Sequence, residues 1–127
     1  SLGVLMTSAL AAADELLIPL QCEFFGLEGL AKIVHVQEQV RLSGANPNGT
    51  IEGIVMTMFD GRTNLSKQVV EQVRQYFPDE VYKTVIRRSI RLGEAPSYGQ
   101  SIIEYDNNSN GAIDYRSLAK EFLKRRK

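Results

Sequence analysis

Three short apolar segments alternate with two amphipathic segments, and this alternation constrains the fold more than any other feature of the sequence. The apolar segments cover residues 16–20, 51–59 and 81–86. The first shows no polar alternation, which is typical of a strand covered on both faces. The intervening residues 25–42 and 65–77 space their apolar side chains as helices do. The order strand, helix, strand, helix, strand predicts right-handed crossovers and a parallel sheet.

Both ends of the chain also predict helices. Residues 1–13 have helical spacing, and a last helix is expected to start at Asn110 or Ser109 and to reach Arg126. Between the third strand and this last helix, residues 101–105 are predicted to form a short fourth strand. Asn64 is the expected N-cap of the helix over 65–77. The inner face of the last helix is predicted to consist of Ala112, Tyr115, Ala119 and Phe122.

Composition sets limits on function. The 127 residues suit one domain that can bury a core. The formal net charge is zero, so binding to nucleic acid would have to depend on a local patch. Cys22 is the lone cysteine, which excludes an internal disulfide, fits a reducing compartment and predicts a buried thiol. No apolar run reaches the roughly 20 residues of a membrane span, and residues 1–13 lack the basic start of a signal peptide.

A basic segment follows the third predicted strand. It carries Arg87, Arg88 and Arg91, and no acidic residue lies in 83–91. Open α/β sheets place ligands beyond the carboxyl ends of their strands, and a positive loop at that position suits phosphate. The alternative is a solvated loop whose arginines pair with nearby acids such as Glu94. Charge alone favours this second interpretation.

The sequence offers little for metal binding or bond breaking. Residues 106–114 resemble a calcium loop, but the twelfth position holds Ser117 instead of the bidentate glutamate. We therefore interpret the segment as a polar turn that caps the last helix. His35 has no second ligand near it in sequence. No glycine-lysine phosphate loop and no serine nucleophile motif is present, so we assign no catalytic residue and no metal ligand.

Three stretches together point to one family. They are Gln-Cys-Glu at 21–23, Arg-Thr-Asn-Leu at 62–65 and Glu-Ala-Pro-Ser at 94–97. With the segments around them, the chain resembles, in order and over nearly its whole length, the C-terminal half of the ParA/Soj chromosome- and plasmid-partitioning ATPases. The resemblance implies the C-terminal half of a P-loop NTPase fold of α/β class, with a mainly parallel sheet flanked by helices. Residues 1–127 would be the C-terminal part of a single ATPase domain.

The resemblance also implies a function. Family members of this deviant Walker A class bind ATP and Mg²⁺, form an ATP-dependent sandwich homodimer and coat DNA without sequence preference. A ParB-type partner stimulates their hydrolysis, and they work in the bacterial cytoplasm on the nucleoid, with no membrane involved. The phosphate-gripping Walker A half would lie upstream of Ser1. We therefore expect a fragment that does not hydrolyse ATP alone and does not hold the nucleotide tightly.

The family pattern assigns roles to individual residues. The arginines that match Arg62 and Arg91 carry DNA contacts in the family. One lies after the second predicted strand and the other after the third, so both loops are expected to lie side by side at one edge of the sheet. Arg88, Lys83 and Lys67 are predicted to help on the basis of charge alone. Arginine contacts to phosphate carry no base preference.

Three residues are candidates for nucleotide binding. Thr57 and Met58, at the end of the second strand, would line the adenine, with core packing as the alternative role. Arg87 stands where the family usually has the proline beside the adenine. The substitution puts the usual base pocket in doubt, and it is equally compatible with an added DNA contact.

Two other functions remain open. A MinD-like membrane-positioning ATPase would need a C-terminal amphipathic membrane helix, whereas the last predicted helix buries its apolar face in the domain. A non-catalytic α/β interaction module is consistent with Arg87. An upstream lysine-bearing phosphate loop would separate the partitioning ATPase from the interaction module.

Overall fold

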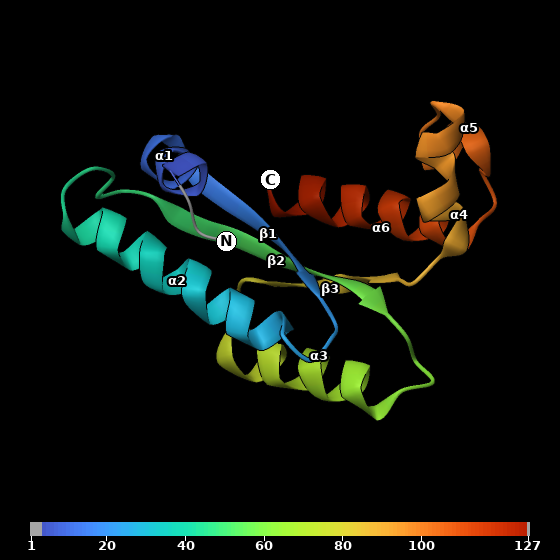
Figure 1. Cartoon of the computed structure of the whole chain (residues 1–127), viewed down its shortest axis with the longest axis horizontal. Coiled ribbons are helices and arrows are strands. Elements are labelled where there is room, and N and C mark those ends of the chain that lie inside the picture. The colour runs from blue at the N-terminus through green and yellow to red at the C-terminus, as the bar shows by residue number, and fades with distance from the viewer. Residues whose placement is uncertain (1–3, 127) are drawn as a thin grey trace.

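A three-stranded parallel sheet in the order β1–β2–β3 forms the centre of the structure, a computed structural model that describes residues 4–126 (Figure 1). The strands are β1 (Glu15–Gln21), β2 (Thr50–Phe59) and β3 (Val81–Arg87). Both strand pairs are parallel, with β2 in the middle. The predicted parallel sheet is therefore confirmed, and each strand agrees with its predicted segment to within a residue.

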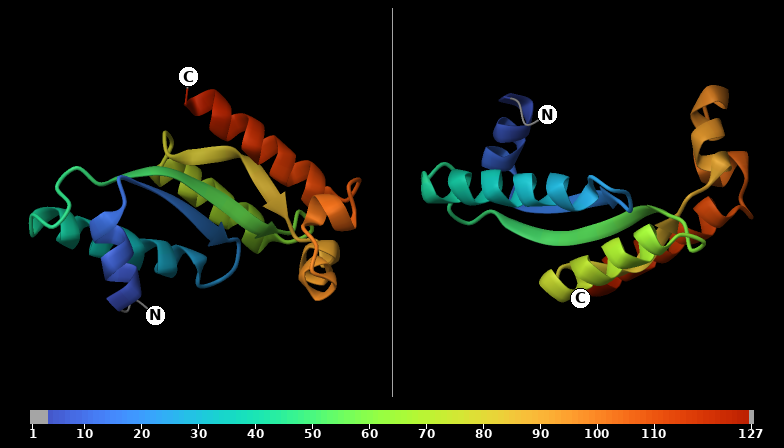
Figure 2. Two further views of the ribbon diagram at one scale, coloured as in Figure 1. Left: turned by 90° about the horizontal axis from the view of Figure 1, so that it is seen from above. Right: turned by 60° about the horizontal axis from the view of Figure 1, so that its bottom comes forward.

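Helices cover both faces of this sheet. The helical elements are α1 (Val4–Ala12), α2 (Gly26–Leu42), α3 (Asn64–Tyr76), α4 (Ile90–Glu94), the 3₁₀ turn η1 (Ala95–Tyr98), α5 (Ile102–Tyr105) and α6 (Asn110–Arg125). The first predicted helix is confirmed from Val4 onward, and its first three residues lie outside the described residues. The short helices α4, η1 and α5 project from one end of the sheet (Figure 2).

The central strand β2 packs against helices on both faces of the sheet. Ile54 and Met56 of β2 are fully buried in the cluster that β1, β2 and β3 form with α2 and α3. Val55, between them, points to the other face and packs with β3 and α6. This alternation is what the period of a strand requires. Since β2 is buried on both faces, its near-continuous apolar sequence follows from its central place in the sheet.

Two local predictions were wrong. Thr63, not Asn64, caps α3, because the Thr63 hydroxyl accepts a hydrogen bond from the Ser66 N–H at 3.2 Å. Residues 101–105 form the helical turn α5 and not a strand. The reason is a capping box, in which the Ser101 hydroxyl accepts from the Glu104 N–H while the Glu104 carboxylate accepts from the Ser101 N–H.

The last helix has a different inner face from the predicted one. Ser109 caps α6 through the Ala112 N–H, as expected of the polar turn before it. Ala112 is buried and Phe122 packs on the sheet, but Tyr115 and Ala119 are exposed. Tertiary contacts at both ends of α6 set its rotation, because the polar side chains of Asp114, Glu121 and Arg125 point at β3 and β2.

Candidate polyanion site at the carboxyl end of the sheet

The loops that follow β2 and β3 start at the same point. Phe59 at the end of β2 pairs with Arg87 at the end of β3. The Arg88 N–H then donates to the Phe59 carbonyl at 2.9 Å. This bond holds the two loops together at the carboxyl edge of the sheet, where open α/β sheets bind ligands. In Figure 1, the loop before α3 and the segment leading into α4 leave the sheet at the same end.

Arg62 is held in place by the turn that carries it. Asp60 accepts hydrogen bonds from the Arg62 main-chain N–H, Nε and Nη2, each at 3.0 Å. These bonds lower the pKa of the Asp60 carboxyl to about 2. The Arg62 side chain remains 88% exposed. The contact uses Nε and Nη2, so the Nη1 edge of the guanidinium is left to solvent, where it is able to meet a phosphate.

Arg87 has a partner that the sequence did not indicate. Asp114 on α6 accepts from the Arg87 main-chain N–H at 2.9 Å, and from Nε and Nη2, each at 3.0 Å. Hydrogen bonds with Asp114 raise the pKa of the Arg87 guanidinium. Asp114 is buried, and Arg87 is half-exposed. Arg87 therefore joins the end of β3 to the start of α6, and its outward-facing part borders the carboxyl edge.

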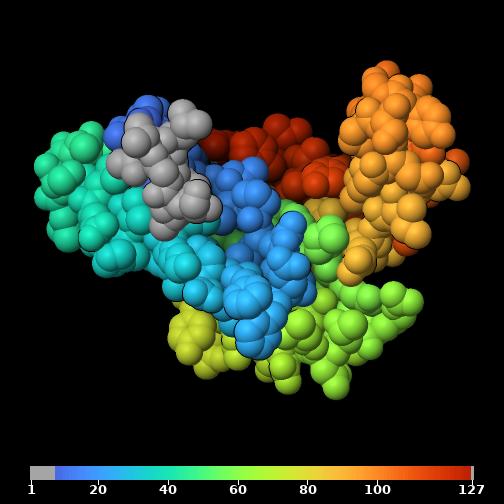
Figure 3. Space-filling view, in the orientation of Figure 1, coloured from blue at the N-terminus to red at the C-terminus, as the bar shows by residue number. Residues whose placement is uncertain are grey.

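Three arginines share one hollow at this edge. Arg62, Arg87 and Arg88 line a depression of about 400 Å³, together with Phe59 and Ile90. In the space-filling view, the segment from α4 to α5 stands clear of α3, and the end of the sheet is open between them (Figure 3). Asp60 lines the same hollow and pairs with Arg62, and Asp114 pairs with Arg87, so Arg88 supplies the excess positive charge. A net positive field favours an anionic ligand.

Arg91 lies one residue beyond Ile90, on α4. Its guanidinium is 3.4 Å from Asp106 and 3.9 Å from Glu94, and it lies 5.9 Å from the centre of the Tyr105 ring. Hydrogen bonding to Tyr105, and the charges of both carboxylates, raise the pKa of Arg91. More than half of the side chain is exposed. Arg62 and Arg91 thus lie at the same end of the sheet, Arg62 in the turn after β2 and Arg91 on α4 after β3.

The two predicted lysines lie elsewhere. Lys67 on α3 borders a second hollow with Phe59 and Arg74. Lys83, near the start of β3, lines a third hollow beside Arg74 and Asp79. Lys83 therefore does not share a hollow with Arg62 and Arg88, whereas the hollow of Lys67 adjoins theirs, since Phe59 lines both. The structure places both lysines along the outer edge of β3.

The candidates on β2 differ in exposure. The Thr57 carbonyl accepts from the Cys22 N–H at 2.9 Å, which ties the ends of β1 and β2 together. Met58 is 40% exposed and has a φ of 56°, in the left-handed region that non-glycine residues seldom adopt. Such conformations cluster at functional sites. Nothing about methionine in the sequence signals this conformation.

Cys22 is buried as predicted, and burial raises the pKa of its thiol to about 11.

The residues present fit only part of a nucleotide site. Arg87 lines the hollow at the carboxyl edge, and Thr57 and Met58 lie near the end of the neighbouring strand β2. The sequence contains no glycine-lysine loop to hold the phosphates. No group of three or more metal-ligating side chains exists within residues 4–126. Thr57, Met58 and Arg87 are thus candidate contacts for a base, and residues 4–126 show neither a glycine-lysine loop nor a cluster of metal ligands.

Solved structures define the class of fold. The cobyrinic acid a,c-diamide synthase of Mycobacterium smegmatis matches with a TM-score of 0.72 and 29% identity, over 100% of this chain and 44% of that one. A structure of the same synthase with bound ADP and magnesium matches with a TM-score of 0.69 and 29% identity, over 97% and 42% of the two chains. The chain thus has the fold of about half of a P-loop ATPase domain.

Sequence comparisons are more specific. The AAA_31 family, described as an AAA domain, matches residues 1–51. The chain is 50% identical over 125 residues to the chromosome partitioning protein ParA of Myxococcus xanthus, covering 98% of this chain and 44% of that protein. It is 51% identical over 121 residues to the sporulation initiation inhibitor protein Soj of Bacillus subtilis, covering 95% and 47%. In sequence the chain is therefore similar to the ParA/Soj proteins over nearly all of its length, and it spans about half the length of the curated relatives it matches.

Proposed function

We propose that this chain forms the C-terminal half of a partitioning ATPase of the ParA/Soj type, a nucleotide-dependent switch that holds DNA without reading its sequence. About 50% identity to two named partitioning proteins, over nearly the whole chain, supports the proposal. The proposal treats residues 1–127 as part of one ATPase domain. No helix within residues 4–126 has the length and apolar character needed to cross a bilayer.

One observation carries the DNA-binding part of the proposal. Guanidinium groups from two separate loops gather at the carboxyl edge of the sheet, with Arg62 and Arg88 lining one hollow and Arg91 adjacent to it. Arginine binds phosphate through two parallel N–H groups, without base preference. In this proposal Arg62 and Arg91 are the principal phosphate contacts, and Arg88 supports them.

The nucleotide part of the proposal depends on residues beyond this chain. ATP and Mg²⁺ would be held mainly by a phosphate loop, and Thr57, Met58 and Arg87 would form the wall beside the base. A solved synthase of similar fold holds ADP and magnesium, which supports a nucleotide and Mg²⁺ as the ligands of the complete domain. The proposal also includes ATP-dependent dimerisation and stimulation of hydrolysis by a ParB-type partner. The protein would act in the bacterial cytoplasm, on the nucleoid.

The test is a double substitution in the full-length protein, Arg62→Gln with Arg91→Gln. Glutamine is preferable to glutamate, because a new carboxylate at position 91 would face Glu94 and Asp106. DNA retention on a duplex-coated surface at low salt should be abolished, while ATP-dependent dimerisation by light scattering stays intact.

The matched control removes two cations from another face. Lys32→Gln with Arg41→Gln also deletes two exposed, ion-paired positive charges, both on α2. This control should bind DNA as the parent protein does. If the test variant kept parental DNA affinity at low salt, the roles given to Arg62 and Arg91 would be wrong.

A further inference from the structure

Positive charges that lack a carboxylate partner are concentrated on one edge of the molecule. Within residues 4–126, seven lysine and arginine side chains form ion pairs with acidic side chains, including Arg62, Arg87 and Arg91 at the carboxyl edge. Seven others form none. Two of these, Arg88 and Arg116, lie elsewhere. The other five line hollows beside β3, and we call them the β3-edge strip: Lys67, Arg74, Lys83, Lys120 and Lys124.

The strip is continuous across three elements. Lys67 and Arg74 lie on α3, Lys83 on β3, and the remaining two lysines on α6. Arg74 lines both the 780 Å³ hollow that contains Lys83 and the 360 Å³ hollow that contains Lys67. The Arg74 guanidinium also donates to the Lys83 carbonyl at 3.4 Å. Helices α3 and α6 cover opposite faces of the sheet, so the strip crosses its outer edge.

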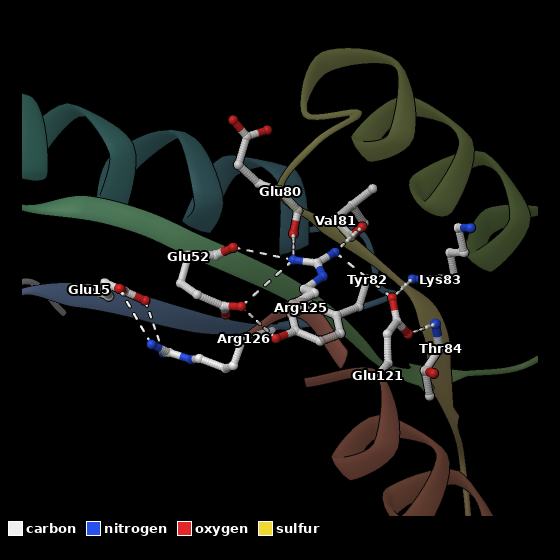
Figure 4. Close-up of polar contacts among 10 residues, drawn as sticks. All are labelled: Glu15, Glu52, Glu80, Val81, Tyr82, Lys83, Thr84, Glu121, Arg125 and Arg126. Carbon is white, nitrogen blue, oxygen red and sulfur yellow. Dashed lines mark hydrogen bonds and ion pairs between the residues drawn. The ribbon is translucent and has the colours of Figure 1, made fainter. Parts of the chain in front are cut away.

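Three acids line the same hollows, Glu71 in one and Asp79 with Glu121 in the other. Within residues 4–126, none of the three forms an ion pair with a cation of the strip, and the only one of them that is ion-paired is Glu121, with Arg125. The Glu121 carboxylate accepts from the main-chain N–H groups of Lys83 and Thr84, each at 2.8 Å, and lies 3.8 Å from Arg125 (Figure 4). Burial raises the pKa of Glu121, but the hydrogen bonds lower it by a larger amount. The net pKa of Glu121 therefore lies below its ordinary value. The Glu121 carboxylate therefore contacts the β3 backbone and Arg125, and it does not pair with a cation of the strip. The five cations of the strip face solvent.

We propose that the β3-edge strip is a second phosphate-binding surface for duplex DNA, which adjoins the carboxyl edge at Lys67 and extends along β3 to Lys124; this proposal rests on the proposed function. An overall charge of zero makes such a local excess of cations informative. Lys120 and Lys124 are four residues apart on one face of α6, a rise of about 6 Å, which suits successive contacts along a sugar-phosphate backbone.

The strip favours a duplex over a single strand. Single-strand sites offer exposed aromatic rings on which bases stack. Tyr82, an aromatic residue beside the strip, is fully buried, with its ring covered by Arg125 at 3.6 Å. Lys120 and Lys124 line the hollow whose aromatic side chain is this buried tyrosine, and lysine contacts to the phosphate backbone carry no sequence information. The strip therefore adds affinity that is salt-dependent and independent of sequence.

The test compares salt dependence in the full-length, ATP-bound protein. Each phosphate contact contributes a slope of about −0.9 in log affinity against log salt. Lys120→Gln with Lys124→Gln should therefore reduce the slope by about 1.8. Measured by anisotropy of a labelled duplex from 50 to 200 mM KCl, the parent should lose about 12-fold more affinity than the variant. The charge-conserving pair Lys120→Arg with Lys124→Arg should keep the parental slope.

The other outcomes are equally informative. The proposal for the strip would be overturned if the folded glutamine pair, checked by circular dichroism, kept the parental salt slope. If Arg62→Gln reduced the slope in the same assay, the proposed function would remain intact. Absence of DNA binding by the parent would instead overturn the proposed function. If the glutamine pair lost only co-sedimentation with phosphatidylserine vesicles, the partner would be a lipid surface and the DNA proposal would fail.

Discussion

Replacing Arg125 with methionine tests how α6 is attached to the sheet. The Arg125 guanidinium donates to the main-chain carbonyls of Glu52 at 3.2 Å, Glu80 at 3.1 Å and Val81 at 2.8 Å (Figure 4). It also lies over the Tyr82 ring and 3.8 Å from the Glu52 carboxylate. One side chain thus joins the last helix to the amino ends of β2 and β3.

The expected magnitude follows from burial. Removing one partner of a buried charge pair costs about 3–5 kcal/mol, because the remaining charge loses its compensation. Arg125 is 24% exposed, which places the loss of unfolding free energy near the lower end, at about 3 kcal/mol. Methionine keeps much of the contact with Tyr82, so the loss is mainly electrostatic. Arg125→Lys keeps the charge but not the planar fork, and should cost about half as much.

Urea unfolding followed by far-ultraviolet circular dichroism measures this loss. With a slope of about 2 kcal/mol/M, Arg125→Met should lower the midpoint by about 1.5 M. Arg126→Met is the matched control, since Arg126 is the next residue and pairs with Glu15 at 2.9 Å while half-exposed. An exposed pair contributes less than about 1 kcal/mol. If both variants shifted the midpoint equally, Arg125 would not hold the helix as argued.

Two further predictions concern glycine and aspartate positions. A Cβ at Gly53 would lie 2.8 Å from Cδ1 of the fully buried Tyr82, so Gly53→Ala should lower the unfolding free energy by about 1–3 kcal/mol. A Cβ at Gly29 on α2 would meet no atom within 4 Å, so Gly29→Ala should raise the unfolding free energy slightly. If thermal unfolding showed equal effects for the two alanine variants, the packing described at Gly53 would be wrong. The Asp60 carboxyl should titrate near pH 2 by carbon NMR, so its contact with Arg62 persists above about pH 4 and is lost as pH falls through about 2. In Arg62→Gln the midpoint should return toward 3.8, and a midpoint that stays near 2 would mean that Arg62 is not the cause.

Local patterns in the sequence were sufficient for the order of the main elements. Apolar runs predicted all three strands, and helical spacing predicted α2, α3 and α6. These signals depend on short-range periodicity, which survives in any context where one face is buried. The same reasoning placed Arg62 and Arg91 on loops at one end of the sheet, because parallel strands share their carboxyl edge.

Contacts between distant residues lay beyond such patterns. Asp114 lies 27 positions from Arg87, and its inward rotation moved Tyr115 and Ala119 of α6 to the surface. Residues 101–105 contain apolar residues that suit a strand, but the capping box decided for a helical turn.

The sequence alone determined that this chain is an α/β unit with arginine-bearing loops after its second and third strands. Only the tertiary structure decided which cations are paired with carboxylates and which are not. Arg62, Arg87 and Arg91 have carboxylate partners, whereas Lys67 and Lys83 belong to an unpaired strip along β3. The physical reason is that ion pairing depends on distances of a few ångströms across elements, and a linear pattern of charges does not contain those distances.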